Sequence, residues 1–146
     1  MFRDNATGEY TLSIRGTESV VKDIIIADLY GIAAQGFERG QSLSLFRYYK
    51  KLTTIEGQTV TYSTEELLMM KSLMTGVFDP FVSLDDVIAE VANDTGLGII
   101  LAAAQINVAG HSLGGHLAMV FSTMFPDSIK HVYKRGQIKT GSGLTY

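Results

Sequence analysis

The chain has 146 residues, with 12 Lys and Arg against 15 Asp and Glu, which gives a formal net charge of −3. Hydrophobic residues make up 46% of the chain, enough for a packed core, so the composition excludes a wholly disordered protein. Net acidity without a basic cluster argues against a nucleic-acid partner, because phosphate binding needs concentrated Lys and Arg. The longest apolar stretch, residues 96–104, is far shorter than the roughly 20 residues of a membrane span. We therefore expect no transmembrane segment.

The first predicted element is a hairpin over residues 1–15, because Asp4–Gly8 has the composition of a turn and lies between two extended runs. Apolar residues at helical spacing and capping residues then predict several helices. These helices are expected over residues 20–32, over residues 41–52, from Ser63 onward, and over residues 83–93.

Strands return in the last third of the chain. Residues 106–109 read as a short buried strand, residues 110–115 as a turn, residues 116–125 as a helix, and residues 129–133 as another strand. Strands that alternate with helices predict an α/β fold, with a mostly parallel sheet flanked by helices. We expect one domain over residues 1–146.

Two features bear on location and completeness. The N-terminus lacks the charged start and apolar run of a cleaved signal peptide, and the absence of Cys excludes disulfides and thiolate metal sites. Charged residues reach only 18%, below the roughly 25% of an ordinary soluble domain. Either some apolar surface meets a partner or part of the domain is missing.

The run Gly110-His111-Ser112-Leu113-Gly114 matches G-x-S-x-G, the nucleophile elbow, between a predicted strand and a predicted helix. Its glycines permit a turn tight enough to hold Ser112 with its hydroxyl exposed above the sheet. Ser112 is therefore the candidate nucleophile. The amide of Leu113, at the helix N-terminus, is a candidate donor to an oxyanion. The alternative interpretation is a glycine-rich strand-to-helix turn in an unrelated α/β protein.

A second motif, Arg15-Gly16-Thr17, follows the predicted strand and lies about 95 residues before the elbow. With both motifs in this order, the chain resembles the class 3 lipases and the bacterial secreted lipases related to them, over roughly residues 2–133. The resemblance implies an α/β-hydrolase fold, an extracellular location and an ester or lipid substrate cleaved by acyl transfer through Ser112. It also implies that the amide of Thr17 is the second hydrogen-bond donor to the oxyanion. The alternative is an ordinary strand-to-helix turn capped by Thr17 or Ser19.

The sequence does not supply a triad Asp and His at the positions where the resembling families have them. In the resembling families the Asp and His of the triad lie downstream of the nucleophile, each at the end of a later strand. After Ser112 only 34 residues remain, with Asp127 as the one acidic residue and with His116 and His131. A helix of about 14 residues rises roughly 20 Å, so Asp127 and His131 are expected at the far edge of the sheet. His116 is expected within the helix, beneath the elbow.

We therefore expect the triad Asp and His outside this chain. A truncated hydrolase domain that self-associates through its exposed surfaces would fit that expectation. No cofactor is implied, and the three histidines lack a metal-ligand pattern. The second hypothesis is a non-catalytic structural or interaction module that retains the elbow as a packing turn. Residues 63–83 are a candidate lid over the site, and packing in the core is the alternative. The sequence does not distinguish a lipase from an esterase, a thioesterase or a transacylase.

Overall fold

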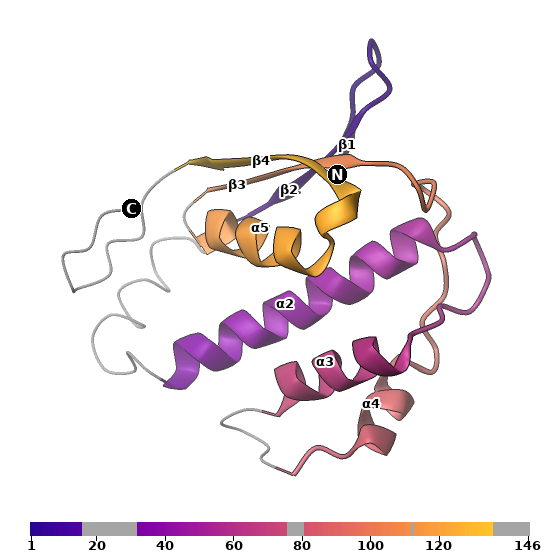
Figure 1. Ribbon diagram of the computed structural model, residues 1–146, viewed down its shortest axis with the longest axis vertical. Coiled ribbons are helices and arrows are strands. Elements are labelled where there is room, and N and C mark those ends of the chain that lie inside the picture. Colours follow the sequence, from indigo (N-terminus) through magenta and orange to yellow (C-terminus); the bar gives the residue numbers. More distant parts are fainter. Residues whose placement is uncertain (16–31, 76–80, 112, 136–146) are drawn as a thin grey trace, which may run out of the picture. The chain divides into compact units, whose positions relative to one another are not determined.

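The computed structural model describes residues 1–15, 32–75, 81–111 and 113–135 (Figure 1). Thr17, Ser112 and nearly all of the helix expected over residues 20–32 lie outside these ranges. The contacts of the chain divide it into two compact units, which we name the sheet unit (Met1–Lys22 with Gln105–Tyr146) and the helical unit (Asp23–Ala104). Each unit is described by itself. One domain over residues 1–146 stays a prediction.

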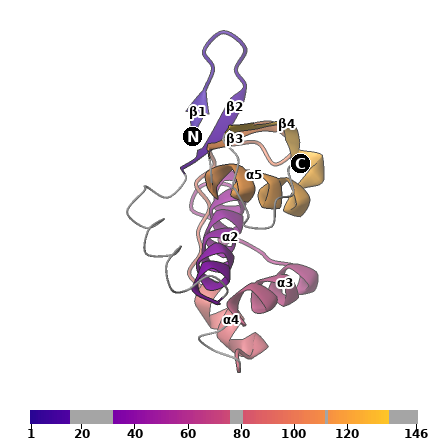
Figure 2. The same cartoon turned by 90° about the vertical axis from the view of Figure 1, so that its left-hand side faces the viewer.

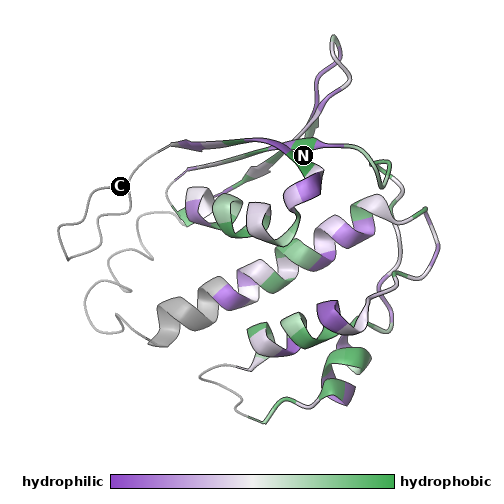
Figure 3. Cartoon of the chain, in the orientation of Figure 1, coloured by the Kyte–Doolittle hydropathy of each residue, from purple (hydrophilic) through white to green (hydrophobic). Residues whose placement is uncertain are grey.

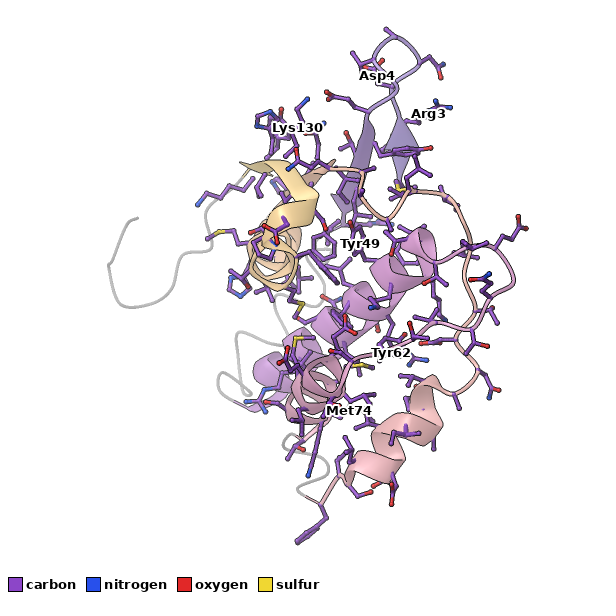
Figure 4. All side chains as sticks on the ribbon, turned by 45° about the vertical axis from the view of Figure 1, so that its right-hand side comes forward. Arg3, Asp4, Tyr49, Tyr62, Met74 and Lys130 are labelled. Atoms are coloured by element: carbon purple, nitrogen blue, oxygen red, sulfur yellow. The ribbon has the colours of Figure 1, made fainter. Side chains whose placement is uncertain are left out.

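The predicted hairpin is confirmed. Strands β1 (Phe2–Arg3) and β2 (Tyr10–Ile14) pair antiparallel. The Asp4 carboxylate accepts hydrogen bonds from the amides of Ala6 at 2.7 Å and Thr7 at 3.2 Å, and these bonds lower the pKa of Asp4. Local side-chain acceptance of this kind is why Asp favours turns. Figure 4 labels Arg3 and Asp4 at this end of the sheet unit.

The described strands form one sheet in the order β1-β2-β3-β4, with β3 (Ile106–His111) and β4 (Ile129–Arg135). Pairing is parallel between β2 and β3 and between β3 and β4, so the predicted mixed α/β arrangement with a mostly parallel sheet is confirmed. Strands β3 and β4 each run two residues beyond the expected ends at residues 109 and 133. The sequence pattern misses these residues because they are glycine and polar side chains, whereas backbone pairing with the neighbouring strand continues through them.

Helix α5 (Leu113–Met124) covers one face of this sheet (Figures 1 and 2). Its start lies three residues before the predicted one, because Gly114 and Gly115 join its first turn despite their low helix propensity. It ends ahead of Pro126, as expected for a residue that cannot continue a helix; Pro126 opens the short helix η1 (Pro126–Ser128). The buried side chains of the sheet unit come from both layers: Leu12, Ile106, Val108, Leu117, Ala118 and Phe121.

The pairing of β3 with β4 contains a β-bulge. Ile106 lies opposite Ile129, but Asn107 lies opposite His131, so Lys130 is an extra residue in β4. The Lys130 ammonium, labelled in Figure 4, pairs with the Glu9 carboxylate. Glu9 also accepts a hydrogen bond from Asn107 Nδ2 at 3.1 Å. Lys130 and then Asn107 lower the pKa of Glu9. These polar contacts tie the start of β2 to the starts of β3 and β4, an edge of the sheet that we name the amino edge.

The helical unit contains α2 (Ile32–Thr53), α3 (Thr64–Met74) and α4 (Leu84–Val91), with α3 packed against both α2 and α4. Helix α2 begins nine residues before the predicted start at residue 41. The predicted helix starts only after Gly40, whereas α2 continues through this residue, because a glycine inside a helix costs only about 1 kcal/mol. None of the helices in the described ranges combines the length and apolar character that crossing a bilayer requires.

Capping boxes fix the starts of α3 and α4 where the sequence predicts them. Ser63 Oγ accepts from the Glu66 amide at 3.2 Å, and the Glu66 carboxylate accepts from the Ser63 amide at 2.8 Å. Ser83 and Asp86 repeat this exchange at the start of α4, whose end at Val91 comes two residues before the predicted one. In α3, Met70 is fully buried and Leu68 is 52% exposed, so part of the segment considered as a lid packs in the core of its own unit.

A buried carboxylate joins α2 to the chain after α4. The Asp94 side chain accepts two hydrogen bonds from the Arg47 guanidinium, both at 2.9 Å, and one from the Tyr62 hydroxyl at 2.6 Å. The Lys51 ammonium lies 2.7 Å from Asp94 Oδ1. Burial by itself would raise the pKa of Asp94, but the bonds from Arg47, Lys51 and Tyr62 outweigh it and hold that pKa well below its ordinary value.

Candidate active site

The candidate site lies where β3 turns into α5. Strand β3 ends at His111 and α5 begins at Leu113, on either side of Ser112 in the sequence. Ser112 itself lies outside the described residues. The strand before the motif and the helix after it are both present, which is the context that the nucleophile-elbow interpretation requires.

Gly110 makes this tight turn sterically feasible. A Cβ atom at Gly110 would lie 2.0 Å from the Gly114 carbonyl oxygen and 2.6 Å from the Gly115 amide nitrogen. Both distances are far below van der Waals contact, and the opposing atoms are backbone that cannot swing away. Any side chain at residue 110 would therefore push the first turn of α5 off the end of β3. Gly115 is also close-packed, because a Cβ there would lie 3.3 Å from the Gly110 carbonyl oxygen.

The first turn of α5 supplies backbone donors at this point. Amides in the first turn of a helix have no intrahelical acceptor, and the aligned peptide dipoles favour negative charge there. Leu113 is the first residue of α5 and is partly exposed, whereas Gly114 is buried. The position of Leu113 therefore suits the oxyanion role expected from the sequence.

The Arg15-Gly16-Thr17 motif begins at the same edge of the sheet. Because β2 and β3 are parallel, with Ile14 opposite Gly110, the chain leaves β2 level with the end of β3. Arg15 is exposed there, and Thr17 lies outside the described residues. In open α/β sheets, ligands bind outside the carboxyl ends of the parallel strands. We name this side of the sheet unit the carboxyl edge.

The histidines and the acidic residue that follow Ser112 are placed as expected. Asp127 is exposed in η1, just before the residue that pairs with the first residue of β3. His131 lies opposite Asn107, four residues before His111, which corresponds to about 13 Å along a strand. Both therefore belong to the amino edge. His116 lies one turn into α5 and is partly exposed, and His111 is exposed at the end of β3.

The register also brings a residue to the elbow that the sequence analysis missed. Lys134 of β4 lies opposite Gly110, and its Cβ lies 3.5 Å from the position that a Cβ of Gly115 would take. No motif marks this lysine, because its position depends on the pairing of β4 with β3 and on the bulge at Lys130. Only the three-dimensional register reveals it.

Among the described residues, no group of three or more His, Cys, Asp or Glu side chains could hold a metal ion. The described residues of the site instead offer backbone donors, an exposed histidine and cations. Comparison with known proteins gives no match to this chain among protein-family models, curated sequences or solved structures.

Proposed function

We propose that this chain carries the nucleophile of a serine carboxylic ester hydrolase of the lipase or esterase type, with an α/β-hydrolase fold similar to that of the class 3 lipases. The observation that carries the proposal is the close approach of Gly110 to the Gly114–Gly115 backbone, where the end of β3 meets the first turn of α5. A sharp passage from strand to helix is the arrangement that exposes a serine hydroxyl above a sheet.

In this proposal, the Ser112 hydroxyl oxygen adds to the carbonyl carbon of the ester while a base takes its proton. The amides of Thr17 and Leu113 donate to the resulting oxyanion. The carbon–oxygen bond to the alcohol breaks, the alcohol takes the proton, and water then hydrolyses the acyl-Ser112 ester. We place the base, a His, and the Asp that orients it outside this chain, because Asp127 and His131 lie at the amino edge.

A fluorophosphonate probe tests the nucleophile directly, in a chain extended to include the triad His and Asp that the proposal requires. We expect covalent labelling that maps to Ser112, disappears in Ser112→Ala and persists in Ser122→Ala. Ser122 is a matched control because it lies in α5, the helix that begins after Ser112, and its hydroxyl donates to the Met119 carbonyl at 2.7 Å. Circular dichroism verifies that each variant folds. If Ser112 reacts no faster than Ser122 in the folded chain, the proposal is wrong.

A non-catalytic interaction module is the second candidate function. The observation that favours it is the position of Asp127 and His131 at the amino edge, away from the end of β3. This candidate expects no selective reaction at Ser112. The labelling experiment therefore separates the two functions.

A further inference from the structure

We infer that the ester handled at the elbow carries an anionic group, a carboxylate or a phosphate, and that Lys134 binds it. The inference rests on the proposed function and specifies its substrate class. Three observations support it: the position of Lys134 beside the elbow, the neutral partner of its ammonium, and the separation of charges between the two edges of the sheet.

Lys134 lies beside the first turn of α5. It lies opposite Gly110, two residues before Ser112, and neighbouring strands are about 4.8 Å apart with a rise of about 3.3 Å per residue. A Cβ at Gly110 would meet the first turn of α5, so Gly110 and its partner Lys134 face α5. A lysine side chain at this position is long enough to bring its ammonium to a substrate bound at the first turn of the helix.

The charge of Lys134 is not neutralised by its contacts. Its ammonium lies 3.7 Å from the thioether sulfur of Met119, a neutral and weak acceptor. Within the described residues, Lys134 has no carboxylate partner, and the side chain is exposed. An exposed cation whose contact is a thioether remains available to an anion from solution.

Among the residues that the structure describes, the two edges of the sheet differ in charge. The described carboxylates of the sheet unit all belong to the amino edge or its hairpin: Asp4, Glu9 and Asp127. At the carboxyl edge the register places Lys134, and Arg15 follows directly after β2. Hydrophilic residues mark this end of β4 in Figure 3. Cations gathered at one edge raise the local concentration of an anionic substrate.

The binding test uses the chain itself and does not depend on catalysis. Backbone-amide NMR titrations compare 4-hydroxybenzoate and phenyl phosphate with the neutral 4-hydroxybenzamide. We expect saturable shifts at residues 113–115 and 133–135 with both anions and none with the amide. Lys134→Gln is expected to weaken anion binding threefold to tenfold, as for an exposed charge pair assisted by neighbouring cations.

Lys130→Gln is the matched control, because it removes the same charge from the same strand at the amino edge. Equal weakening by Lys134→Gln and Lys130→Gln, or equal shifts with the neutral amide, would overturn the inference.

A second measurement separates this inference from the proposed function. In the chain extended to include the triad His and Asp, the acetyl group of 4-acetoxybenzoate or of 4-acetoxybenzamide is transferred to Ser112 and detected by peptide mass, with Ser112→Ala as the blank. We expect faster transfer from the anionic ester, with the advantage lost in Lys134→Gln. Equal transfer from both esters refutes the anionic substrate and leaves the hydrolase. Anion binding at Lys134 without any acylation of Ser112 refutes the hydrolase and leaves an anion site.

Discussion

Replacement of Asp94 by Asn tests the buried network of the helical unit. The Asp94 side chain is 3% exposed and faces three donors, from Arg47, Lys51 and Tyr62. Asn keeps the volume, but it removes the charge and brings an NH₂ group against those donors. Removing one partner of a buried ion pair costs about 3–5 kcal/mol. Arg47 and Lys51 keep 20% and 32% of their side-chain surface exposed and can turn toward water, which lowers the expected loss to about 2–3 kcal/mol.

Urea unfolding followed by circular dichroism measures this loss. With a slope of about 1.5–2 kcal/mol per molar urea, the midpoint should fall by about 1–2 M. Asp85→Asn is the control, because it removes the same charge from an exposed position in the first turn of α4; its effect should stay within about 0.5 kcal/mol. If Asp94→Asn and Asp85→Asn shift the midpoint equally, the reasoning about the network is refuted.

The remaining predictions concern acid stability, the elbow and a helix cap. The pKa of Asp94 is lowered in the folded state, so the contribution of this carboxylate to stability is present above the unfolded pKa of about 3.9 and is lost as pH falls through the folded pKa. The free energy of unfolding should therefore fall less steeply below pH 4 in Asp94→Asn than in the unmodified chain, and parallel curves would contradict this. Gly110→Ala should lower the free energy of unfolding by about 3 kcal/mol or more through the 2.0 Å clash with Gly114, whereas Gly40→Ala, with no atom within 4 Å of the new Cβ, should raise it by up to about 1 kcal/mol; thermal melts in which both variants move the same way would refute the contact. Ser63→Ala should cost about 1 kcal/mol by removing the cap of α3, and an unchanged melt would show that the cap does not contribute.

Local signals of the sequence predict local structure well in this chain. The caps of α3 and α4 depend on residues three positions apart, so the boxes at Ser63 and Ser83 can be read directly from the sequence. The elbow motif likewise predicts a strand before it and a helix after it. Element ends are predicted less well, because β3 continues through Gly110 and α2 through Gly40 under the control of pairing and packing.

Features that join distant segments are not predicted. Arg47 and Asp94 are 47 positions apart, and no pattern connects them. The place of Lys134 beside Gly110 depends on a register that β4 adopts only after its bulge. For the same reason the sequence identifies the turn that would hold a nucleophile but does not show which charges surround that turn.

The bulge at Lys130 has a consequence for how the chain can change in evolution. If all residues of β4, Lys130 included, paired regularly without a bulge, Tyr133 in place of Lys134 would lie opposite Gly110, and every later residue of β4 would exchange faces. The phenol ring of Tyr133 would then lie against the first turn of α5, next to Gly115, where the side chain of Lys134 lies in this structure. Loss of the Lys130 codon would remove the bulge and keep Lys134 opposite Gly110, whereas loss of the Val132 or Tyr133 codon would bring Arg135 to that place. Related sequences should therefore tolerate a deletion at the bulge better than one within the later part of β4.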